Sequence, residues 1–432
     1  MIKIQVPHTK FVPSAGIRLI LSLSLSLSLS LSLTLTLTLT LTLSLAFGLA
    51  QAAPYTPAND ADIVERLPGR ASDPAIRRVE SLRKQLAARP DDTDLRIEIA
   101  RRYFDMAMAQ GDPRYVGYAS AAIAPLAKTA PANSNVSAQA DYFLVLGLIQ
   151  QFSHQFEPAL VNLAKASQLN PKSADPLLWR SAIFMVQARY PEALVECQRA
   201  TPLADPLLGL GCSAYVQATN GELDPAFEKL ATAVKAAPQA APELLLWQST
   251  RLAEMAWRLE RFDTAEAYFK NALKQGVTDQ FLLGAYADFL LARQRPGEVI
   301  SLLTDWERSD ILLLRLALAG KATDDKRSVN WAAQLRDRFA AAALRGDRLH
   351  EQEAARFELD IESNAAKALT LASANYNIQK EPRDAEILMR AALAAKQAKT
   401  AQVAMDWLRS SRYQDPAFVT LAAQLAAQGA TR

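Results

Sequence analysis

Residues 142–171 read YFLVLGLIQQFSHQFEPALVNLAKASQLNP, and this stretch decides the fold. It places Gly147 in its first half, Ala159 in its second half and Pro171 at its end. Two antiparallel helices can approach to about 8–10 Å where each carries a small residue, and proline cannot continue a helix. The stretch therefore predicts two packed helices that end at Pro171.

The same pattern returns further along the chain. In residues 176–200, PLLWRSAIFMVQARYPEALVECQRA, Ser181, Ala193 and Cys197 stand 34 residues after Gly147, Ala159 and Leu163. Further units carry small or large apolar residues at the matching positions: Gly221, Ala226, Leu230, Ala233 and Pro238, then Leu252, Ala253, Phe262, Ala265, Phe269 and Ala272, then a degenerate unit from Leu283 to Trp306. A fixed period of this length indicates a stack of helical repeats.

These units resemble the tetratricopeptide repeat. The resemblance implies an all-α fold, an α-α superhelix of antiparallel helix pairs, in which the first helix of each pair lines a concave groove. It also implies a non-catalytic protein that binds a peptide or helix of another protein in that groove. The family's groove positions fall on nine residues of this chain: Gln151, Met185, Tyr215, Trp247, Arg251, Glu254, Trp257, Arg258 and Asp288.

Two of these residues have a second interpretation. Trp247, Arg251, Glu254 and Trp257 share one helix face, and Trp and Arg are enriched where proteins bind one another. However, Trp247 and Trp257 also suit the apolar core between repeats. The Lys and Asn residues with which some relatives clamp a terminal carboxylate are missing here, which argues against that ligand.

Residues 1–52 have the features of a signal peptide. The basic residues Lys3, Lys10 and Arg18 precede an uncharged run from Leu19 to Leu49, and cleavage is predicted after Ala52. The run is long enough for an uncleaved membrane anchor as well. The sequence therefore predicts a periplasmic protein, with an inner-membrane-anchored protein that faces the periplasm as the alternative.

The rest of the chain divides by composition. Residues 53–75 are rich in Ala and Pro and form a predicted tether, residues 76–308 form the repeat solenoid with its firmest repeats at about 140–305, and residues 309–432 form diverged C-terminal repeats and a cap. The stretch from Gly320 to Ser328 is the clearest internal break.

Several other classes of function are excluded or weakened. The chain has 48 basic and 45 acidic residues, and the three basic residues of the first segment account for the difference, so a nucleic-acid-binding surface is not expected. The glycines of Gly209–Ala214 match a dinucleotide motif in letters only, because they fall within a predicted helix. His350-Glu351 begins a zinc-protease motif that Ala354 breaks. No cofactor and no metal are expected.

Cys197 and Cys212 are the two cysteines of the chain. They are predicted on consecutive packed helices of an exported protein, where a disulfide can form. Cys197 also occupies a core position, in which a free thiol packs as a small hydrophobic group. Both states stay open at this point.

The sequence thus favours a non-catalytic scaffold of the bacterial cell envelope that helps to assemble a complex. The alternative is an enzyme or a small-ligand-binding protein with a site among the C-terminal helices, around His350, Glu351, Glu353 and Glu358. A third possibility is a structural protein whose own N-terminal tether fills the groove.

Overall fold

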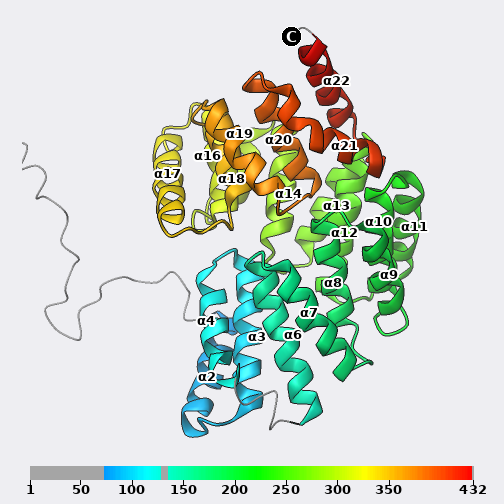
Figure 1. The fold of residues 1–432 in the computed structure, drawn as a ribbon, viewed down its shortest axis with the longest axis vertical. Helices are drawn as coiled ribbons and strands as arrows, with labels where there is room; N and C mark the ends of the chain where they lie inside the picture. Colours follow the sequence, from blue (N-terminus) through cyan, green and yellow to red (C-terminus); the bar gives the residue numbers. More distant parts are fainter. Residues whose placement is uncertain (1–72, 128–134, 431–432) are drawn as a thin grey trace, which may run out of the picture. The chain divides into compact units, whose positions relative to one another are not determined.

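The computed structural model describes residues 73–127 and 135–430, so the predicted signal segment and nearly all of the predicted tether lie outside the described part. The described residues form 20 α-helices, and none of them forms a strand (Figure 1). The first half contains α2 (Pro74–Ala88), α3 (Thr93–Gln110), α4 (Arg114–Ile123), η1 (Ala124–Ala127), α6 (Val136–Phe152), α7 (Phe156–Leu169), α8 (Asp175–Val186), α9 (Tyr190–Ala200), α10 (Pro206–Thr219), α11 (Leu223–Ala236), α12 (Pro242–Arg258) and α13 (Phe262–Lys274). The second half contains α14 (Gln280–Ala292), α15 (Pro296–Leu303), α16 (Asp310–Ala322), α17 (Ser328–Leu344), α18 (Glu351–Asp360), α19 (Ala365–Tyr376), α20 (Pro382–Ala394), η2 (Ala398–Ala401), α21 (Gln402–Ser411) and α22 (Pro416–Ala430).

The helices pack in successive pairs. α6 packs on α7, α8 on α9, α10 on α11 and α12 on α13, and the same pairing continues through α18 with α19. The described residues form one compact unit. The predicted all-α fold of stacked helix pairs is therefore confirmed, and it is of the tetratricopeptide type.

Small residues lie where the paired helices touch. A Cβ atom on Gly147 would stand 2.8 Å from Cγ of Leu163, so α6 and α7 approach as closely as the sequence predicts. Ala159 and Leu163 are fully buried in this contact. In α16, Gly320 has the same relation to Trp331 of α17, so the segment from Gly320 to Ser328 ends one helix and turns into its partner.

A single type of turn joins the two helices of most pairs. One residue of each turn has a positive φ, and only one of these six positions is a glycine: His154, Ala188, Gly221, Glu260, Gln294 and Asp324. The amide after it donates to a carbonyl five residues earlier, as Arg189 N does to Phe184 O at 2.8 Å. This bond closes the end of the first helix in the same way in each repeat.

The last helices return to the middle of the chain. The indole nitrogen of Trp407 in α21 donates to the hydroxyl of Tyr190 at the start of α9, at 2.7 Å. Lys380 N donates to Val186 O at the end of α8, at 2.7 Å. The C-terminal helices thereby cover the edge formed by the turns of the middle repeats.

Candidate partner-binding surface

The first helix of each pair lies on the inner side of the stack. α6 contacts α8, α8 contacts α10, and the series of contacts continues through α20 with α22. Within the described residues, the second helices, such as α7 and α9, do not approach one another to this extent. Successive helices approach one another most closely on the concave side of a curved stack, so the even-numbered helices from α6 to α22 form the inner layer.

Four of the nine predicted groove residues form one cluster on this layer. The guanidinium carbon of Arg251 in α12 lies 3.9 Å from the ring centre of Tyr215 in α10 and 5.9 Å from that of Trp247. Its Nη1 atom donates to Glu254 Oε2 at 2.8 Å. The side chains of Arg251 and Glu254 remain 26% and 31% exposed, so solvent reaches them. We call these four residues the inner cluster.

The surroundings of the inner cluster are partly dehydrated. Burial raises the pKa of Tyr215, although the charge of Arg251 acts in the opposite direction. For Arg251, burial acts to lower the pKa, but Tyr215 and Glu254 outweigh it and keep the guanidinium charged. A charged group that stacks on an aromatic ring in such surroundings interacts more strongly than at an open surface.

Trp257 packs against other residues of the protein and is not part of the inner cluster. The ring of Trp257 is half-buried, and it packs edge-on against Phe289 of α14, with their centres 5.6 Å apart, at the border of the apolar core of the middle repeats. Trp247 is half-buried and is not part of that core. The two tryptophans thus differ in their surroundings, which the sequence does not reveal.

Asp288 belongs to a chain of alternating charges that crosses four inner helices. Arg315 of α16 and Arg356 of α18 each approach its carboxylate to 2.7 Å. Burial alone would raise the pKa of Asp288, but these two cations outweigh it and lower the pKa to about 2. Arg356 and Arg390 of α20 then both face Asp360, at 3.6 and 2.6 Å.

Arg258 holds the returning C-terminal segment. Its Nε atom donates to Gln414 O at 3.0 Å and its Nη2 atom to Ala218 O at 2.7 Å. The guanidinium also lies 3.9 Å from the ring centre of Tyr413. The side chain of Gln414 in turn accepts from Leu223 N at 2.9 Å, at the start of α11. Arg258 is therefore occupied by the chain itself.

The remaining predicted groove residues lie at helix ends. Gln151 is in the last turn of α6, where its carbonyl accepts from His154 N at 3.0 Å. Met185 is in the last turn of α8 and packs against the core that the middle repeats share with the C-terminal helices. Among the nine predicted groove residues, the structure thus joins Tyr215, Trp247, Arg251 and Glu254 in one cluster and gives the others separate contacts.

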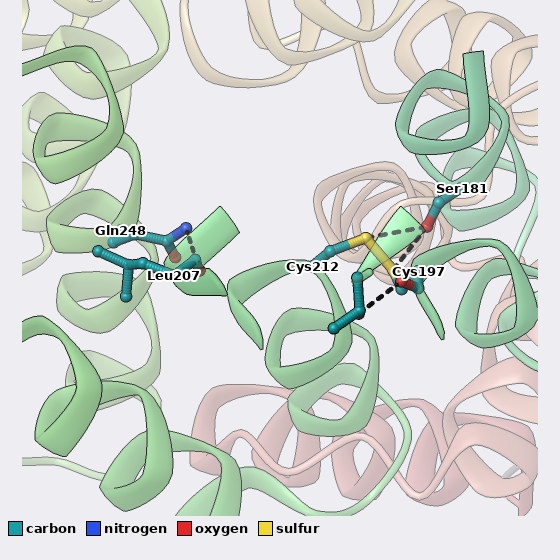
Figure 2. The surroundings of a disulfide bond; sticks show 6 residues. Ser181, Cys197, Leu207, Cys212 and Gln248 are labelled. Carbon is teal, nitrogen blue, oxygen red and sulfur yellow. Dashed lines mark hydrogen bonds between the residues drawn. A yellow bond between two sulfur atoms is a disulfide. The ribbon is translucent and has the colours of Figure 1, made fainter. Parts of the chain in front are cut away.

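Cys197 of α9 and Cys212 of α10 form a disulfide bond between two adjacent pairs (Figure 2). Both residues are buried, and the hydroxyl of Ser181 lies 3.1 Å from Sγ of Cys197. On the other side of α10, the fully buried Gln248 donates from Nε2 to Leu207 O at 3.2 Å (Figure 2). A Cβ atom on Gly211 would overlap that glutamine, so this glycine serves helix packing.

The acidic residues of the alternative site are each paired separately. His350 Nδ1 lies 3.8 Å from Glu353, Glu351 pairs with Arg348 at 2.7 Å, and Glu358 pairs with Lys367 at 2.6 Å. A cleft of about 640 Å³ does lie among the C-terminal helices, but Asp360, Glu386 and Arg390 line it instead. Sequence reasoning missed these residues, because single charges on a helix usually mark a solvated face.

The described residues offer neither a membrane-spanning helix nor a cluster of metal ligands. Residues 73–127 and 135–430 include no helix of the length and apolarity that crossing a membrane requires. The same ranges contain no group of three or more His, Cys, Asp or Glu side chains arranged to hold a metal ion.

Comparison with known proteins gives structural likeness only. No protein-family model and no curated protein sequence matches the chain. Among solved structures, it is similar to yeast Tom70, with a TM-score of 0.41 and 13% identity over 82% of this chain and 85% of that one. It is also similar to a Rap protein complexed with competence and sporulation factor, with a TM-score of 0.48 and 13% identity over 82% and 94%. A human IFIT1 dimer with PPP-AAAA gives 0.44 and 12% over 77% of each chain. The assignment of the fold rests on the chain's own period and helix pairing.

Proposed function

We propose that this chain is a non-catalytic scaffold that holds a segment of another protein on its inner layer of helices. The observation that carries the proposal is the inner cluster, in which the guanidinium of Arg251 lies over the ring of Tyr215, near the ring of Trp247, and donates to Glu254. Aromatic and arginine side chains that are held in place before binding lose little entropy when a partner arrives.

We further propose that the protein works in the periplasm of a Gram-negative bacterium, where it helps to assemble a cell-envelope complex. The N-terminal segment has the composition of an export signal, and the bond between Cys197 and Cys212 needs an oxidising compartment to persist. Whether the signal is cleaved or retained as an anchor decides only how the chain is held there.

The binding proposal is tested by affinity capture of the chain from a crosslinked envelope extract. We expect a dominant protein partner that is lost when Trp247 and Arg251 are both changed to Ala. The matched control is Arg336→Ala, which removes an exposed arginine of α17 that pairs with Glu362 and does not belong to the inner cluster. Capture that is equal for all three proteins would exclude the inner cluster as the binding site.

The location is tested separately by fusing the chain to a reporter enzyme that becomes active only after its own disulfides form. We expect activity with residues 1–52 present and none without them. Fractionation then distinguishes a released protein from one that stays with the inner membrane.

A further inference from the structure

We propose that Gly211 of α10 and Gln248 of α12 set the distance between these two inner helices at which Arg251 can stack on Tyr215. Neither Gly211 nor Gln248 belongs to the inner cluster, so their role is to position it. The inference rests on the function proposed above, because the inner cluster is the binding site proposed there. Its basis is a tight contact between the two helices, one turn away from the stacked pair.

The helices α10 and α12 meet at two levels that lie one helix turn apart. Gly211 and Tyr215 are four residues apart on α10, and Gln248 and Arg251 are three residues apart on α12, so each pair shares one face of its helix. At the upper level, the guanidinium carbon of Arg251 lies 3.9 Å from the ring centre of Tyr215. At the lower level, one turn nearer the start of both helices, the side chain of Gln248 lies against Gly211. The spacing at the lower level therefore determines the spacing at the upper level.

The contact between Gly211 and Gln248 has no room for a further atom. A Cβ atom on Gly211 would lie 2.1 Å from Oε1 of Gln248 and 2.3 Å from its Nε2. Gln248 is fully buried, so its amide has no solvent-filled space to move into. Its Nε2 atom also donates to Leu207 O at the start of α10, which holds the side chain in this place (Figure 2). A larger residue at position 211 would therefore push the two helices apart.

The disulfide bond restricts the movement of α10 on its other side. Cys212 follows Gly211 directly and is bonded to Cys197 of α9. A shift of α10 away from α12 would have to carry α9 with it, so we expect α12 to move instead. Arg251 would then lie further from the ring of Tyr215, and the attraction between a cation and an aromatic ring weakens with distance.

The ion pair with Glu254 does not replace this positioning. Arg251 donates to Glu254 Oε2 at 2.8 Å, but both residues belong to α12. The bond holds the guanidinium relative to its own helix and moves with that helix. The Nε atom of Arg251 is buried and has no hydrogen-bond partner, so it does not tie the group to α10 either. The place of Arg251 over Tyr215 thus depends on the distance between the helices.

The test compares Gly211→Ala with Gly284→Ala in the full chain. Gly284 lies in the inner helix α14, and a Cβ atom there would make only ordinary contacts, the nearest at 3.7 Å from Ile311. The measured quantity is the upfield ring-current shift that Tyr215 imposes on the side-chain protons of Arg251. It is read by nuclear magnetic resonance of arginine-labelled protein and assigned with Arg251→Lys. We expect Gly211→Ala to lose most of this shift and Gly284→Ala to keep it.

A double variant distinguishes positioning from a general loss of packing. In Gly211→Ala/Gln248→Ala, the shortened side chain at position 248 leaves space for the new methyl group, so Arg251 should regain its ring-current shift. If the two substitutions only damaged the core, their effects would add in the double variant. Circular dichroism checks that each variant keeps its helix content.

Two results would overturn the proposal. They are an unchanged ring-current shift in Gly211→Ala and a shift that stays lost in the double variant. Affinity capture with the same variants then tests the function proposed above. Loss of the ring-current shift without loss of the captured partner would keep Gly211 and Gln248 as positioning residues and would show that the inner cluster is not the binding site.

Discussion

At Gly147 the two helices of the firmest repeat meet with no space for a further atom. A Cβ atom there would stand 2.8 Å from Leu163 Cγ, and Leu163 is itself fully buried. Gly147→Ala should therefore lower the free energy of unfolding by roughly 1–2 kcal/mol despite the higher helix propensity of alanine. Gly297→Ala is the control, because nothing lies within 4 Å of its new methyl group. Urea denaturation of both variants checks this, and equal stability would contradict it.

The disulfide gives a second prediction for single residues. Changing Cys197 and Cys212 together to Ala removes a bond that closes a separation of 15 residues, which should lower stability by up to about 3 kcal/mol. The melting temperature with and without a reducing agent measures this. Reduction should lower the melting temperature of the unchanged chain and leave that of the double variant as it is.

At the scale of the element, the turns that join the helices of most pairs are unusual. Each of the six turns described above has one residue with a positive φ, and in five of them this residue is not glycine. Ala188, in the turn that follows α8, has a φ of 57°, a conformation that costs an alanine roughly 1 kcal/mol. Ala188→Gly should therefore stabilise the protein by up to about 1 kcal/mol. Ala182→Gly, at an exposed position inside the same helix, should destabilise it by a similar amount. Thermal melts that moved in the same direction would refute this account.

The ion pair between α13 and the start of α15 gives a prediction about pH. Arg295 donates to both carboxylate oxygens of Glu266, at 2.6 and 2.9 Å, and this lowers the pKa of Glu266 to about 2. A carboxyl whose folded pKa is depressed contributes stability above its unfolded pKa of about 4.3, and this contribution is lost as the pH falls toward 2.

The corresponding variant is Glu266→Gln. It should be less stable than the unchanged chain by roughly 2 kcal/mol at pH 7, and the difference should shrink between pH 4.5 and pH 2. Denaturation curves at these pH values measure it. Glu228→Gln is the control, because its carboxylate is 62% exposed and pairs at the surface with Arg261.

At the scale of the whole molecule, Arg258 connects repeats that are far apart in the sequence. Arg258→Ala removes its bonds to Gln414 O and Ala218 O and its contact with Tyr413. We expect a loss of roughly 2–3 kcal/mol and faster hydrogen exchange in α21 and α22, with little change in α6 and α7. Arg409→Ala, which breaks an exposed pair with Asp406 inside α21, should leave the exchange pattern unchanged. Equal hydrogen-exchange rates of α21 and α22 in the two variants would show that Arg258 does not hold the C-terminal helices on the middle repeats.

Local sequence patterns were enough to predict the helix pairs, and this has a physical reason. Gly147, Ala159 and Leu163 recur because two helices of one repeat must interlock within a few tens of residues. No such pattern encodes the return of Trp407 to Tyr190, because the two residues are 217 positions apart. The same applies to Trp247 and Trp257. One is half-buried next to Arg251, whereas the other packs against Phe289 of the following pair. Their role depends on neighbours that their own repeat does not contain.

The packing of the C-terminal helices on the middle repeats also has a consequence for the order in which parts of the chain fold. A chain is made from its N-terminus, so the repeats of α8–α13 can fold before residues 407–414 exist. Until then, Leu223 N lacks the acceptor that Gln414 provides, and the ring of Tyr190 lacks the cover of Trp407. The C-terminal helices thus complete the hydrogen bonds and the packing of the middle repeats. A chain interrupted before residue 407 would present an unfinished edge to chaperones and proteases, even with its central repeats fully made.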